Sequence, residues 1–367
     1  MQNFKSKIKP LSHFHNIPLY QSGDSTILGK ENVIKLSANE NMNGPCNEVV
    51  NQIAHYSKNI FEYPDSNHFA LRSKIGMLHN IDPDRIICGA GSDEIIQLLC
   101  RCFCEKNDEV IYTEHGFLMY KLSALATGAK PVEIKETNRT ASIDNICAGV
   151  TSRTKIIFLA NPNNPTGTMI SETEIEKLLN KIPENILLVL DGAYAEYVNS
   201  FDGGISLVNK FTNLFVTRTF SKIFGLGGLR VGWGYGAKDI IDVLNSVRSP
   251  FNVSSLGLKM AELSVEDVNF VNEQRELNKV NREVLRNRLL DLGLMTDQSF
   301  ANFLLLRFES EKQANTVDLF LKEKGFILRK VSSYGLPKCL RLSIGNKEIC
   351  EKLYLTLAEY FDNDDRI

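Results

Sequence analysis

The sequence predicts an α/β fold, in which a mostly parallel sheet carries helices on both faces and a smaller α+β unit is attached. Two observations lead to this prediction. Between residues 85 and 221, short runs of Ile, Leu and Val alternate with helical segments, as in parallel sheets buried on both faces. After about residue 260, a long charged helix replaces this alternation and is followed by strands and helices in another order. A chain of 367 residues is long enough for two such units.

The elements of the larger unit follow in order along the chain. The segment "RIICGAG" (85–91) is expected to be a strand that ends in a glycine turn. The next segment, "SDEIIQLLCRCF" (92–103), is expected to be a helix with Ser92 or Asp93 placed to cap its first turn. A helix is also expected at "FLMYKLSALATG", closed by Gly128. Further strands are expected at 108–114, 130–136, 154–161, 185–194 and 213–221.

The smaller unit begins with a helix expected at 264–293, which is charged on its outer face. The strand-like runs "ANFLLLRF", "FILRKV" and "CLRLSIG" follow, with a helix expected at 311–325 between the first two. No linker rich in proline or serine separates the two units, so we expect them to pack tightly. We assign residues 36–265 to the large unit, and residues 1–35 and 266–367 to the small unit with its N-terminal arm.

Composition and charge argue against several classes of protein. Lysine and arginine total 42 and acidic residues total 44, a formal net charge of −2. This balance gives no reason to expect nucleic acid or an anionic membrane as a partner. No run approaches the roughly 18 consecutive apolar residues of a membrane span, and the N-terminus lacks the continuous apolar core of a secretory signal. We therefore expect a cytoplasmic protein without a membrane partner.

Three of the eight cysteines lie close together in "CRCFC", at Cys100, Cys102 and Cys104. One interpretation is a metal or redox cluster, and the other is a buried helix that uses cysteine as a small apolar residue. The sequence has no C-x-x-C pair and no histidine near this run. The second interpretation is therefore favoured, and no metal site is expected.

Polar residues gather where the predicted strands end, which is the edge where open α/β sheets bind ligands. The turn "GAGSDE" (89–94) offers backbone amides and a helix N-terminus to a phosphate, a weak signal when taken alone. The motifs "NPNNPTGT", "DGAYAEY" and "TFSKIFGLGGLR" follow later strands. Asn164, Asp191 and Lys222 are each separated by a length that fits one helix and one strand. We therefore expect these three residues at neighbouring strand ends.

These groups together suit one ligand. The Asp191 carboxylate can pair with a pyridinium nitrogen, and the amide of Asn164 and the phenol of Tyr194 can hold a ring oxygen. Lys222 lies in an apolar, glycine-rich segment, and desolvation favours the neutral amine that attacks an aldehyde. A glycine turn with Arg230 can hold a phosphate. Pyridoxal 5′-phosphate (PLP) carries all of the matching groups, so we expect it as the cofactor.

In these motifs the chain resembles the fold-type I PLP-dependent aminotransferases and, among them, the histidinol-phosphate aminotransferase family. The resemblance extends over nearly the whole chain and rests on "LSANEN", "YPD", "GAGSDE", "NPNNPTG", "DGAYAEY", "TRTFSKIFGLGGLRVGWGYG", "PFNVS", "ANFLLL" and "YGLPKCLRLSIG" in the family's order. It implies a sheet of the seven-stranded type and transamination between histidinol phosphate and 2-oxoglutarate in histidine biosynthesis. The "HG" turn before Phe117 departs from the proline-containing turn that is common in the family.

The resemblance also implies a role for each matching residue. Lys222 is implied to bond to the cofactor aldehyde and, once released, to move a proton between the substrate Cα and the cofactor. Asp191 is implied to hold the pyridinium N–H, Asn164 and Tyr194 to contact the ring oxygen, and Phe117 to stack on the ring. The residues implied around the cofactor phosphate are Ser92, Asp93, Thr219, Ser221 and Arg230.

Further matches imply substrate contacts and a second subunit. Arg341 matches the family's arginine for the substrate α-carboxylate, and Arg329 and Tyr20 match positions that contact the substrate phosphate. Asn39, in "NENMNGP", is implied at the substrate side of the site. Tyr63 of "YPD" is implied to reach the cofactor phosphate of a neighbouring subunit, which makes the active unit a homodimer. The implied substrates are histidinol phosphate, or a similar compound, and the pair glutamate and 2-oxoglutarate.

Other functions are weighed against this one. A related PLP enzyme could act on an aromatic amino acid or another phosphorylated amino compound, as an aminotransferase or a phosphoamino-acid decarboxylase. The segment "NENMNGP" lacks the proline that the family usually has after the second asparagine, which keeps this alternative open. A ligand-sensing regulator is disfavoured, because the roughly 30 residues before the first expected core strand are too few for a winged helix. A nicotinamide oxidoreductase is disfavoured, because its glycine fingerprint is incomplete and no acidic ribose ligand is evident.

Overall fold

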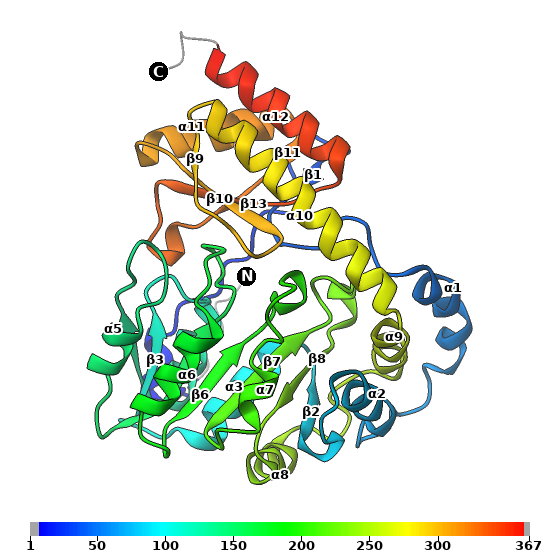
Figure 1. Ribbon diagram of the computed structural model, residues 1–367, viewed down its shortest axis with the longest axis vertical. Helices are drawn as coiled ribbons and strands as arrows, with labels where there is room; N and C mark the ends of the chain where they lie inside the picture. Colours follow the sequence, from blue (N-terminus) through cyan, green and yellow to red (C-terminus); the bar gives the residue numbers. More distant parts are fainter. Residues whose placement is uncertain (1–6, 363–367) are drawn as a thin grey trace.

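The computed structural model describes residues 7–362, which form a large unit and a small unit (Figure 1). Within these residues, the large sheet has seven strands in the order β2-β8-β7-β6-β5-β3-β4, and only β8 runs antiparallel to its neighbours. This sheet confirms the predicted α/β fold. Its strands, in that order, are β2 (Ile86–Gly89), β8 (Gly232–Tyr235), β7 (Leu214–Thr219), β6 (Leu187–Asp191), β5 (Thr154–Ala160), β3 (Glu109–Thr113) and β4 (Lys130–Ile134).

Helices cover both faces of this sheet, because successive strand residues point to opposite sides. In β5, Ile157 and Leu159 pack into a core on one face, whereas Ile156 and Phe158 pack into a core on the other. The helices that contribute to the first core are α1 (Asn47–Tyr56), α2 (Phe69–His79), α5 (Ile143–Ala148), α6 (Glu172–Lys181), α7 (Ile205–Val208) and α9 (Ser255–Glu266). Those that contribute to the second core are α3 (Ser92–Phe103), α4 (Leu118–Thr127) and α8 (Lys238–Val247).

In the described residues, the small unit is a four-stranded antiparallel sheet with three helices over one face (Figure 1). Leu304 and Leu306 of β10 point into the core beneath these helices, whereas Leu305 points to the opposite face, towards the large unit. The sheet order is β12 (Arg329–Lys330), β13 (Cys339–Ser343), β10 (Phe303–Arg307) and β9 (Met295–Thr296), and the helices are α10 (Val268–Asp291), α11 (Glu311–Glu323) and α12 (Lys347–Asp362). A short parallel pair, β1 (Ile34–Lys35) with β11 (Phe326–Ile327), joins the segment before residue 36 to this unit.

Two predictions about local structure are wrong, and one strand of the large sheet was not predicted. The helix expected at 264–293 is interrupted at Asp267, whose side chain accepts a hydrogen bond from Phe270 N at 2.9 Å and begins a new helix, α10. Neither Ser92 nor Asp93 caps α3, because the N-cap residue is Gly91, at φ +81°. Strand β8 escaped prediction because its sequence is GWGY, and glycine weakens the strand signal.

The glycines of β8 are nonetheless required by packing. A Cβ on Gly232 would lie 2.4 Å from Ser92 N, and one on Gly234 would lie 2.5 Å from the Phe215 ring. The strand therefore brings its backbone against the start of α3 and against β7, which a larger residue would prevent. Five short 3₁₀ turns connect elements of the body, at η2 (Ser57–Asn59), η3 (Pro83–Arg85), η4 (Ala195–Tyr197), η5 (Gly227–Leu229) and η6 (Ser332–Tyr334).

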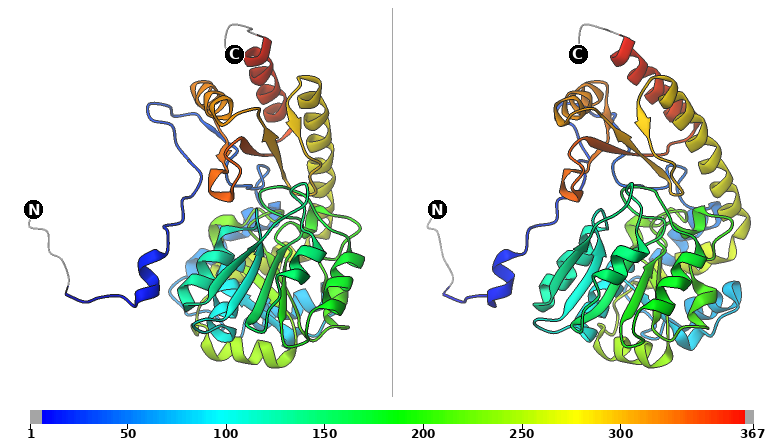
Figure 2. Two further views of the ribbon diagram at one scale, coloured as in Figure 1. Left: turned by 90° about the vertical axis from the view of Figure 1, so that its left-hand side faces the viewer. Right: turned by 60° about the vertical axis from the view of Figure 1, so that its left-hand side comes forward.

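The N-terminal segment runs outside the body of the molecule and carries a 3₁₀ turn, η1 (Ser12–Asn16) (Figure 2). Several of its apolar side chains are exposed, among them Leu11, Leu19 and Leu28. In the described part of the chain, none of the helices is both long and apolar enough to span a bilayer.

The cysteine-rich run lies at the end of α3. Cys100 is fully buried in the core between α3, α4 and α8, and Cys102 and Cys104 pack against the same core. This packing agrees with the interpretation of cysteine as a small apolar residue. Burial raises the pKa of the Cys102 thiol, which disfavours the thiolate that binds metals or reacts. Among residues 7–362, no group of three or more His, Cys, Asp or Glu side chains is arranged to hold a metal ion.

Candidate active site

A cavity of about 390 Å³ lies between the strand ends of the large sheet and the small unit. Strands β5, β6 and β7 contribute Ala160, Asp191 and Thr219 from their carboxyl ends, and β12 and β13 contribute Arg329 and Arg341 from the small unit. The cavity therefore occupies the edge of the sheet at which polar residues are expected to gather. Because both units line it, their relative position determines its shape.

Fourteen of the fifteen residues that the sequence singles out line this cavity. They are Tyr20, Asn39, Ser92, Asp93, Phe117, Asn164, Asp191, Tyr194, Thr219, Ser221, Lys222, Arg230, Arg329 and Arg341. The exception is Tyr63, whose side chain is 82% exposed and whose ring stacks on Phe251 with ring centroids 4.6 Å apart.

Asp191 is a buried carboxylate at the end of β6. Its Oδ2 accepts a hydrogen bond from the Tyr120 hydroxyl at 2.7 Å, and its Oδ1 accepts one from Ala193 N at 3.1 Å. Burial raises the pKa of the Asp191 carboxyl, and the hydrogen bonds from Tyr120 and Ala193 oppose that shift. The result is a buried carboxylate whose two oxygens are oriented by fixed donors.

Lys222 lies on the loop after β7, among small and apolar residues. Its Nζ donates a hydrogen bond to the Ala38 carbonyl at 3.1 Å and lies 5.7 Å from the centroid of the Tyr194 ring. The loop turns at Gly225, at φ +70°, where a Cβ would lie 2.5 Å from the backbone carbonyl of Gly44. Only glycine permits this close approach, so the loop is held against the segment that follows Asn39. An amine held in this way points into the cavity.

The start of α3 and the loop after β7 together form a cationic corner of the cavity. Arg230, at φ +54°, donates to Ser221 Oγ at 3.0 Å and forms an ion pair with Asp93 at 3.3 Å. A Cβ on Gly91 would lie 2.4 Å from the Arg230 guanidinium. Ser221 N also donates to Thr219 Oγ1, at 3.1 Å. The uncapped N-terminus of α3 and this arginine offer N–H donors to an anion.

The two arginines of the small unit face each other across one antiparallel pair, because Arg329 in β12 is the register partner of Arg341 in β13. Arg341 is buried and donates to Asn164 Oδ1 and to the Ser37 carbonyl, the latter at 2.8 Å. Its Nε is buried without a hydrogen-bond partner among the described residues. Burial lowers the pKa of the Arg341 guanidinium, although an arginine stays charged. Arg329 donates to the carbonyl of Gln21 in the N-terminal arm.

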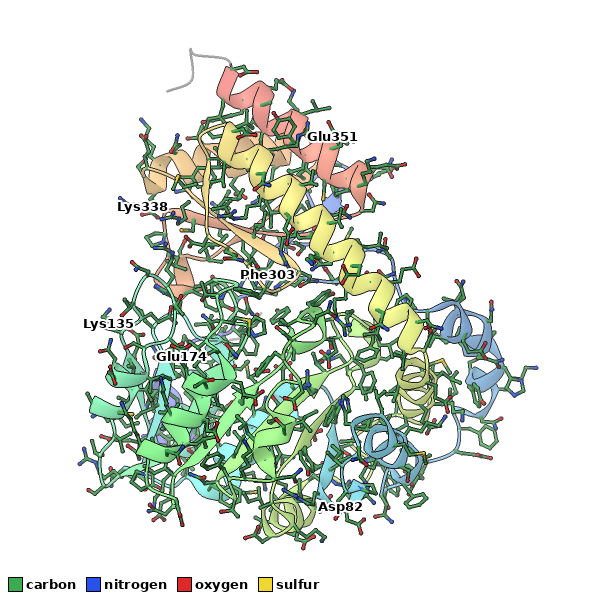
Figure 3. The ribbon with its side chains drawn as sticks, in the orientation of Figure 1. Asp82, Lys135, Glu174, Phe303, Lys338 and Glu351 are labelled. Atoms are coloured by element: carbon green, nitrogen blue, oxygen red, sulfur yellow. The ribbon has the colours of Figure 1, made fainter. Side chains whose placement is uncertain are left out.

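An aromatic residue connects the two halves of the cavity. Phe303, labelled in Figure 3, lies on the side of the small unit that faces the large unit. The Tyr194 ring meets it edge-on with centroids 5.2 Å apart, and the Arg341 guanidinium lies 5.3 Å from its centroid. Asn39, buried at φ +58°, donates from Nδ2 to the Tyr194 hydroxyl at 3.0 Å. The position of Tyr194 is therefore determined by contacts with both units.

The model of the class I and II aminotransferase family matches residues 31–356. This chain belongs to that family. The histidinol-phosphate aminotransferase of Ruegeria sp. (strain TM1040) is 50% identical to it over 355 residues, which cover 97% of this chain and 98% of that protein. The histidinol-phosphate aminotransferase of Paracoccus denitrificans (strain Pd 1222) is 46% identical over 360 residues, 98% of each chain. These relatives confirm the resemblance to the histidinol-phosphate aminotransferase family.

Solved structures of aminotransferases share the fold. A histidinol-phosphate aminotransferase from Sinorhizobium meliloti, in complex with pyridoxal-5′-phosphate, has a TM-score of 0.89 at 22% identity and covers 99% of both chains. An aspartate aminotransferase from Thermus thermophilus, with maleate, has a TM-score of 0.78 at 21% identity and covers 89% of this chain and 91% of its own. At these identities the likeness concerns the fold alone, and it confirms the fold-type I architecture.

Sequence reasoning missed several residues of this aminotransferase site. Tyr120 lines the cavity and holds Asp191. Ser37 and Tyr334 also line it, and although both lie in motifs quoted above, "LSANEN" and "YGLPKCLRLSIG", neither was assigned a role. A signal for Tyr120 did exist, because it follows Phe117 by three residues and therefore lies on the same side of α4. What the sequence could not reveal was that this side of the helix faces the end of β6.

Proposed function

We propose that this protein is a PLP-dependent aminotransferase that transfers an amino group between histidinol phosphate and the pair glutamate and 2-oxoglutarate. The observation that carries this proposal is one cavity that holds Lys222, the buried carboxylate of Asp191 and two arginines paired across a hairpin. The names of relatives about half identical over nearly the full length support the choice of substrate. The reaction belongs to amino-acid biosynthesis, and we propose a cytoplasmic location for it.

The residues present fit the cofactor. Gly91 has no side chain, and no side chain caps the first turn of α3. The backbone amides of that turn can therefore bind a phosphate together with Ser221 and Arg230. Asp191 supplies the carboxylate that a pyridinium nitrogen requires, and Phe117 lines the cavity as a flat ring. When bound, PLP supplies an aldehyde that bonds to amino groups and a ring that withdraws electrons from the bonds of the substrate carbon.

The residues of the chain have separate tasks in this proposal. The Lys222 amine, at the end of a flexible side chain, would take the proton from the substrate Cα and deliver it to the carbon that belonged to the cofactor aldehyde. The amine is held at the cavity by its hydrogen bond to the Ala38 carbonyl, within reach of a substrate carbon. Asp191 holds the ring nitrogen in its charged form, and Asn164 and Tyr194 orient the ring through hydrogen bonds. Thr219, Ser92 and Asp93 complete the phosphate site.

We propose that the small unit selects the substrate. A phosphate monoester and a dicarboxylic acid must both be accepted in turn, and each carries an anion away from the reacting carbon. Arg329, with Tyr20 from the N-terminal arm, is placed to bind that distal anion, and Arg341 is placed to bind the α-carboxylate of glutamate. The orphaned Nε of buried Arg341 supports this assignment, because a carboxylate would supply the missing acceptor. Asn39 acts at the same side, through Tyr194.

The proposal includes a homodimer and a division of the chain into two units. Tyr63 lies outside its own cavity and stacks on Phe251, which is also exposed, and the nearby sequence contributes two further exposed aromatic residues, Phe61 and Phe69. An exposed aromatic region of this kind suits burial against a second copy, where Tyr63 would reach the neighbouring phosphate site. The division at residues 36 and 265 agrees with β1 in the small unit and with the break at Asp267.

The proposed function can be tested by following each half-reaction separately. The purified protein is titrated with histidinol phosphate, phenylalanine and phosphoserine while its absorbance is scanned, since the cofactor changes colour when it accepts an amino group. Histidinol phosphate is expected to give the largest change at the lowest concentration. Borohydride reduction followed by mass spectrometry is expected to place the cofactor on Lys222. A cofactor on another lysine would contradict the proposed reaction. A preference for phenylalanine or phosphoserine would contradict only the assigned substrate.

Substitution of each arginine tests the division of roles. Arg329→Leu is expected to weaken the binding of histidinol phosphate by roughly 30-fold or more, because a charge-assisted contact to a buried anion is worth about 2–5 kcal/mol. Arg341→Leu is expected to weaken the binding of glutamate and 2-oxoglutarate by a similar factor. The binding of histidinol phosphate should change far less, because histidinol phosphate has no carboxylate. An unchanged histidinol phosphate half-reaction in Arg329→Leu would contradict the assigned substrate.

A further inference from the structure

The turn between β3 and α4 carries His115, a buried histidine that reaches the small unit. Its Nδ1 lies 2.8 Å from the carbonyl oxygen of Tyr334 in η6. A carbonyl oxygen only accepts hydrogen bonds, so Nδ1 carries the hydrogen and donates it. The ring edge also packs over Gly335, where a Cβ would lie 3.8 Å from both Nδ1 and Cε1. His115 therefore holds a turn of the small unit by a hydrogen bond and by contact.

The backbone of His115 is fixed to the large unit from two sides. His115 N donates to Glu136 Oε1 at 3.3 Å, and the His115 carbonyl accepts from Asn163 Nδ2 at 3.4 Å. Glu136 follows β4, and Asn163 lies in the motif that follows β5. The imidazole therefore extends from a backbone that is anchored to two strand ends. A side chain held in this way can fix the position of the small unit relative to the large sheet.

The contact joins two residues that line the cavity from opposite sides. Phe117, two residues after His115, lines it from the large unit, and Tyr334 lines it from the small unit, whereas His115 itself does not line it. Leu118, the first residue of α4, packs against the cluster that contains Val331 and Tyr334, so an apolar contact lies beside the hydrogen bond. The distance between Phe117 and Tyr334 is thus determined at this junction.

We propose that His115 is a positioning residue that holds the Tyr334 turn, and with it the hairpin of Arg329 and Arg341, at a fixed distance from the Phe117 turn. The imidazole belongs to the "HG" sequence of the turn that precedes Phe117. The kinetic consequence rests on the proposed function. Without this donor the Tyr334 carbonyl is left buried and unpaired, so the turn shifts to find another partner. The substrate half of the site then loses its placement relative to the cofactor half.

The test compares two substitutions of His115 in the full-length protein with its cofactor bound. His115→Leu keeps the bulk of the side chain and removes the donor, whereas His115→Asn places an amide nitrogen close to the position of Nδ1. His79→Leu serves as a control, because His79 is a half-buried histidine outside the cavity that packs on Trp233. Two quantities are measured for each variant: amide hydrogen exchange of residues 331–336, and KM and kcat for histidinol phosphate and 2-oxoglutarate.

In His115→Leu we expect exchange of residues 331–336 to be about 10-fold faster and KM for both substrates to rise about 10-fold, which is the effect of one lost buried hydrogen bond. We expect kcat to change less than about threefold and His115→Asn to stay close to the wild type. Equal behaviour of the Leu and Asn variants would overturn the proposal, as would faster exchange without a change in KM. If the wild-type protein does not act on histidinol phosphate, the proposed function fails, and the exchange comparison alone decides whether His115 holds the turn.

Discussion

Removal of one hydroxyl group, in Tyr120→Phe, tests how the protein keeps a buried carboxylate charged. The Tyr120 ring is fully buried and lies parallel to the Phe158 ring, with centroids 4.7 Å apart, so a phenylalanine retains the packing. Only the hydrogen bond to Asp191 Oδ2, at 2.7 Å, is lost. Burial raises the pKa of the Tyr120 phenol well above its ordinary value, so the hydroxyl keeps its proton and donates to the carboxylate.

The magnitude follows from the value of a hydrogen bond to a charged group. Such a bond stabilises the ionised carboxylate by about 1.5–3 kcal/mol, and one pKa unit corresponds to about 1.4 kcal/mol. Burial already raises the pKa of Asp191, and loss of the Tyr120 donor raises it further, because that hydrogen bond favours the ionised form. A protonated Asp191 cannot pair with a pyridinium nitrogen. Cofactor affinity is therefore expected to fall as the pH drops through the Asp191 pKa. In Tyr120→Phe this fall begins at a higher pH, and in the acid range the affinity is expected to be about 10- to 100-fold below that of the wild type.

The assay is a titration of the cofactor-free protein with PLP at a series of pH values, followed by absorbance. Tyr112→Phe is the matched control, because Tyr112 is buried and also donates to a carboxylate, Glu133 Oε2 at 3.4 Å, but does not line the cavity. The cofactor's own titration is common to all three proteins, so only the difference between them is interpreted. If the acid limb of the affinity profile does not move, or moves equally in Tyr112→Phe, Tyr120 does not control the charge of Asp191.

Three further experiments give independent tests. Glu109 on β3 accepts three charged or hydroxyl donors that lower its pKa from the usual 4.5 to about 2, so Glu109→Gln is expected to reduce the free energy of unfolding by about 2 kcal/mol at pH 7. This deficit should shrink as the pH falls from about 5 towards 2, where the wild-type carboxylate also becomes protonated, and a deficit that is constant with pH would refute it. Mixed Lys222→Ala and Tyr63→Phe subunits should recover at most about a quarter of wild-type activity through hybrid dimers, whereas full activity of a dilute monomer would contradict a shared site. Gly91→Ala, which places a methyl group 2.4 Å from a guanidinium nitrogen at φ +81°, should weaken PLP binding at least tenfold in the same absorbance titration, and unchanged affinity would show that this corner does not hold the phosphate.

The fold could be predicted where runs of apolar residues indicate buried strands. It could not be predicted where close packing requires residues, such as glycine, that are unusual in a strand. Six strands of the large sheet were predicted correctly. Five of them are largely buried, because strands covered on both faces need apolar residues at most positions, whereas the edge strand β4 is exposed at Lys130 and Glu133. Strand β8 was missed because Gly232 and Gly234 are needed for contact with neighbours that no local pattern reveals. The break at Asp267 was missed because the helical pattern continues through it, and only the cap hydrogen bond to Phe270 N separates α9 from α10.

The candidate site shows the same limit. Motifs at strand ends could be combined because parallel strands bring their carboxyl ends to one edge, so the grouping of Asp191 with Lys222 followed from chain order. The contacts between elements could not be obtained in this way. That Arg341 donates to Asn164, and that Tyr120 donates to Asp191, depends on the packing of elements far apart in sequence. Sequence reasoning thus identified the groups that meet a ligand better than the groups that hold them in place.

The distribution of charge over the two units explains why the site lies between them. The large unit contributes the carboxylate of Asp191 and the helix N-terminus, which suit a cofactor with a cationic ring and an anionic phosphate. The small unit contributes Arg329 and Arg341, which suit anionic substrates. Two buried cations on adjacent strands repel each other, and they are tolerable because Asn164 and backbone carbonyls accept their hydrogen bonds. An arriving carboxylate or phosphate relieves that repulsion, so substrate binding and the docking of the small unit on the large unit are expected to favour each other.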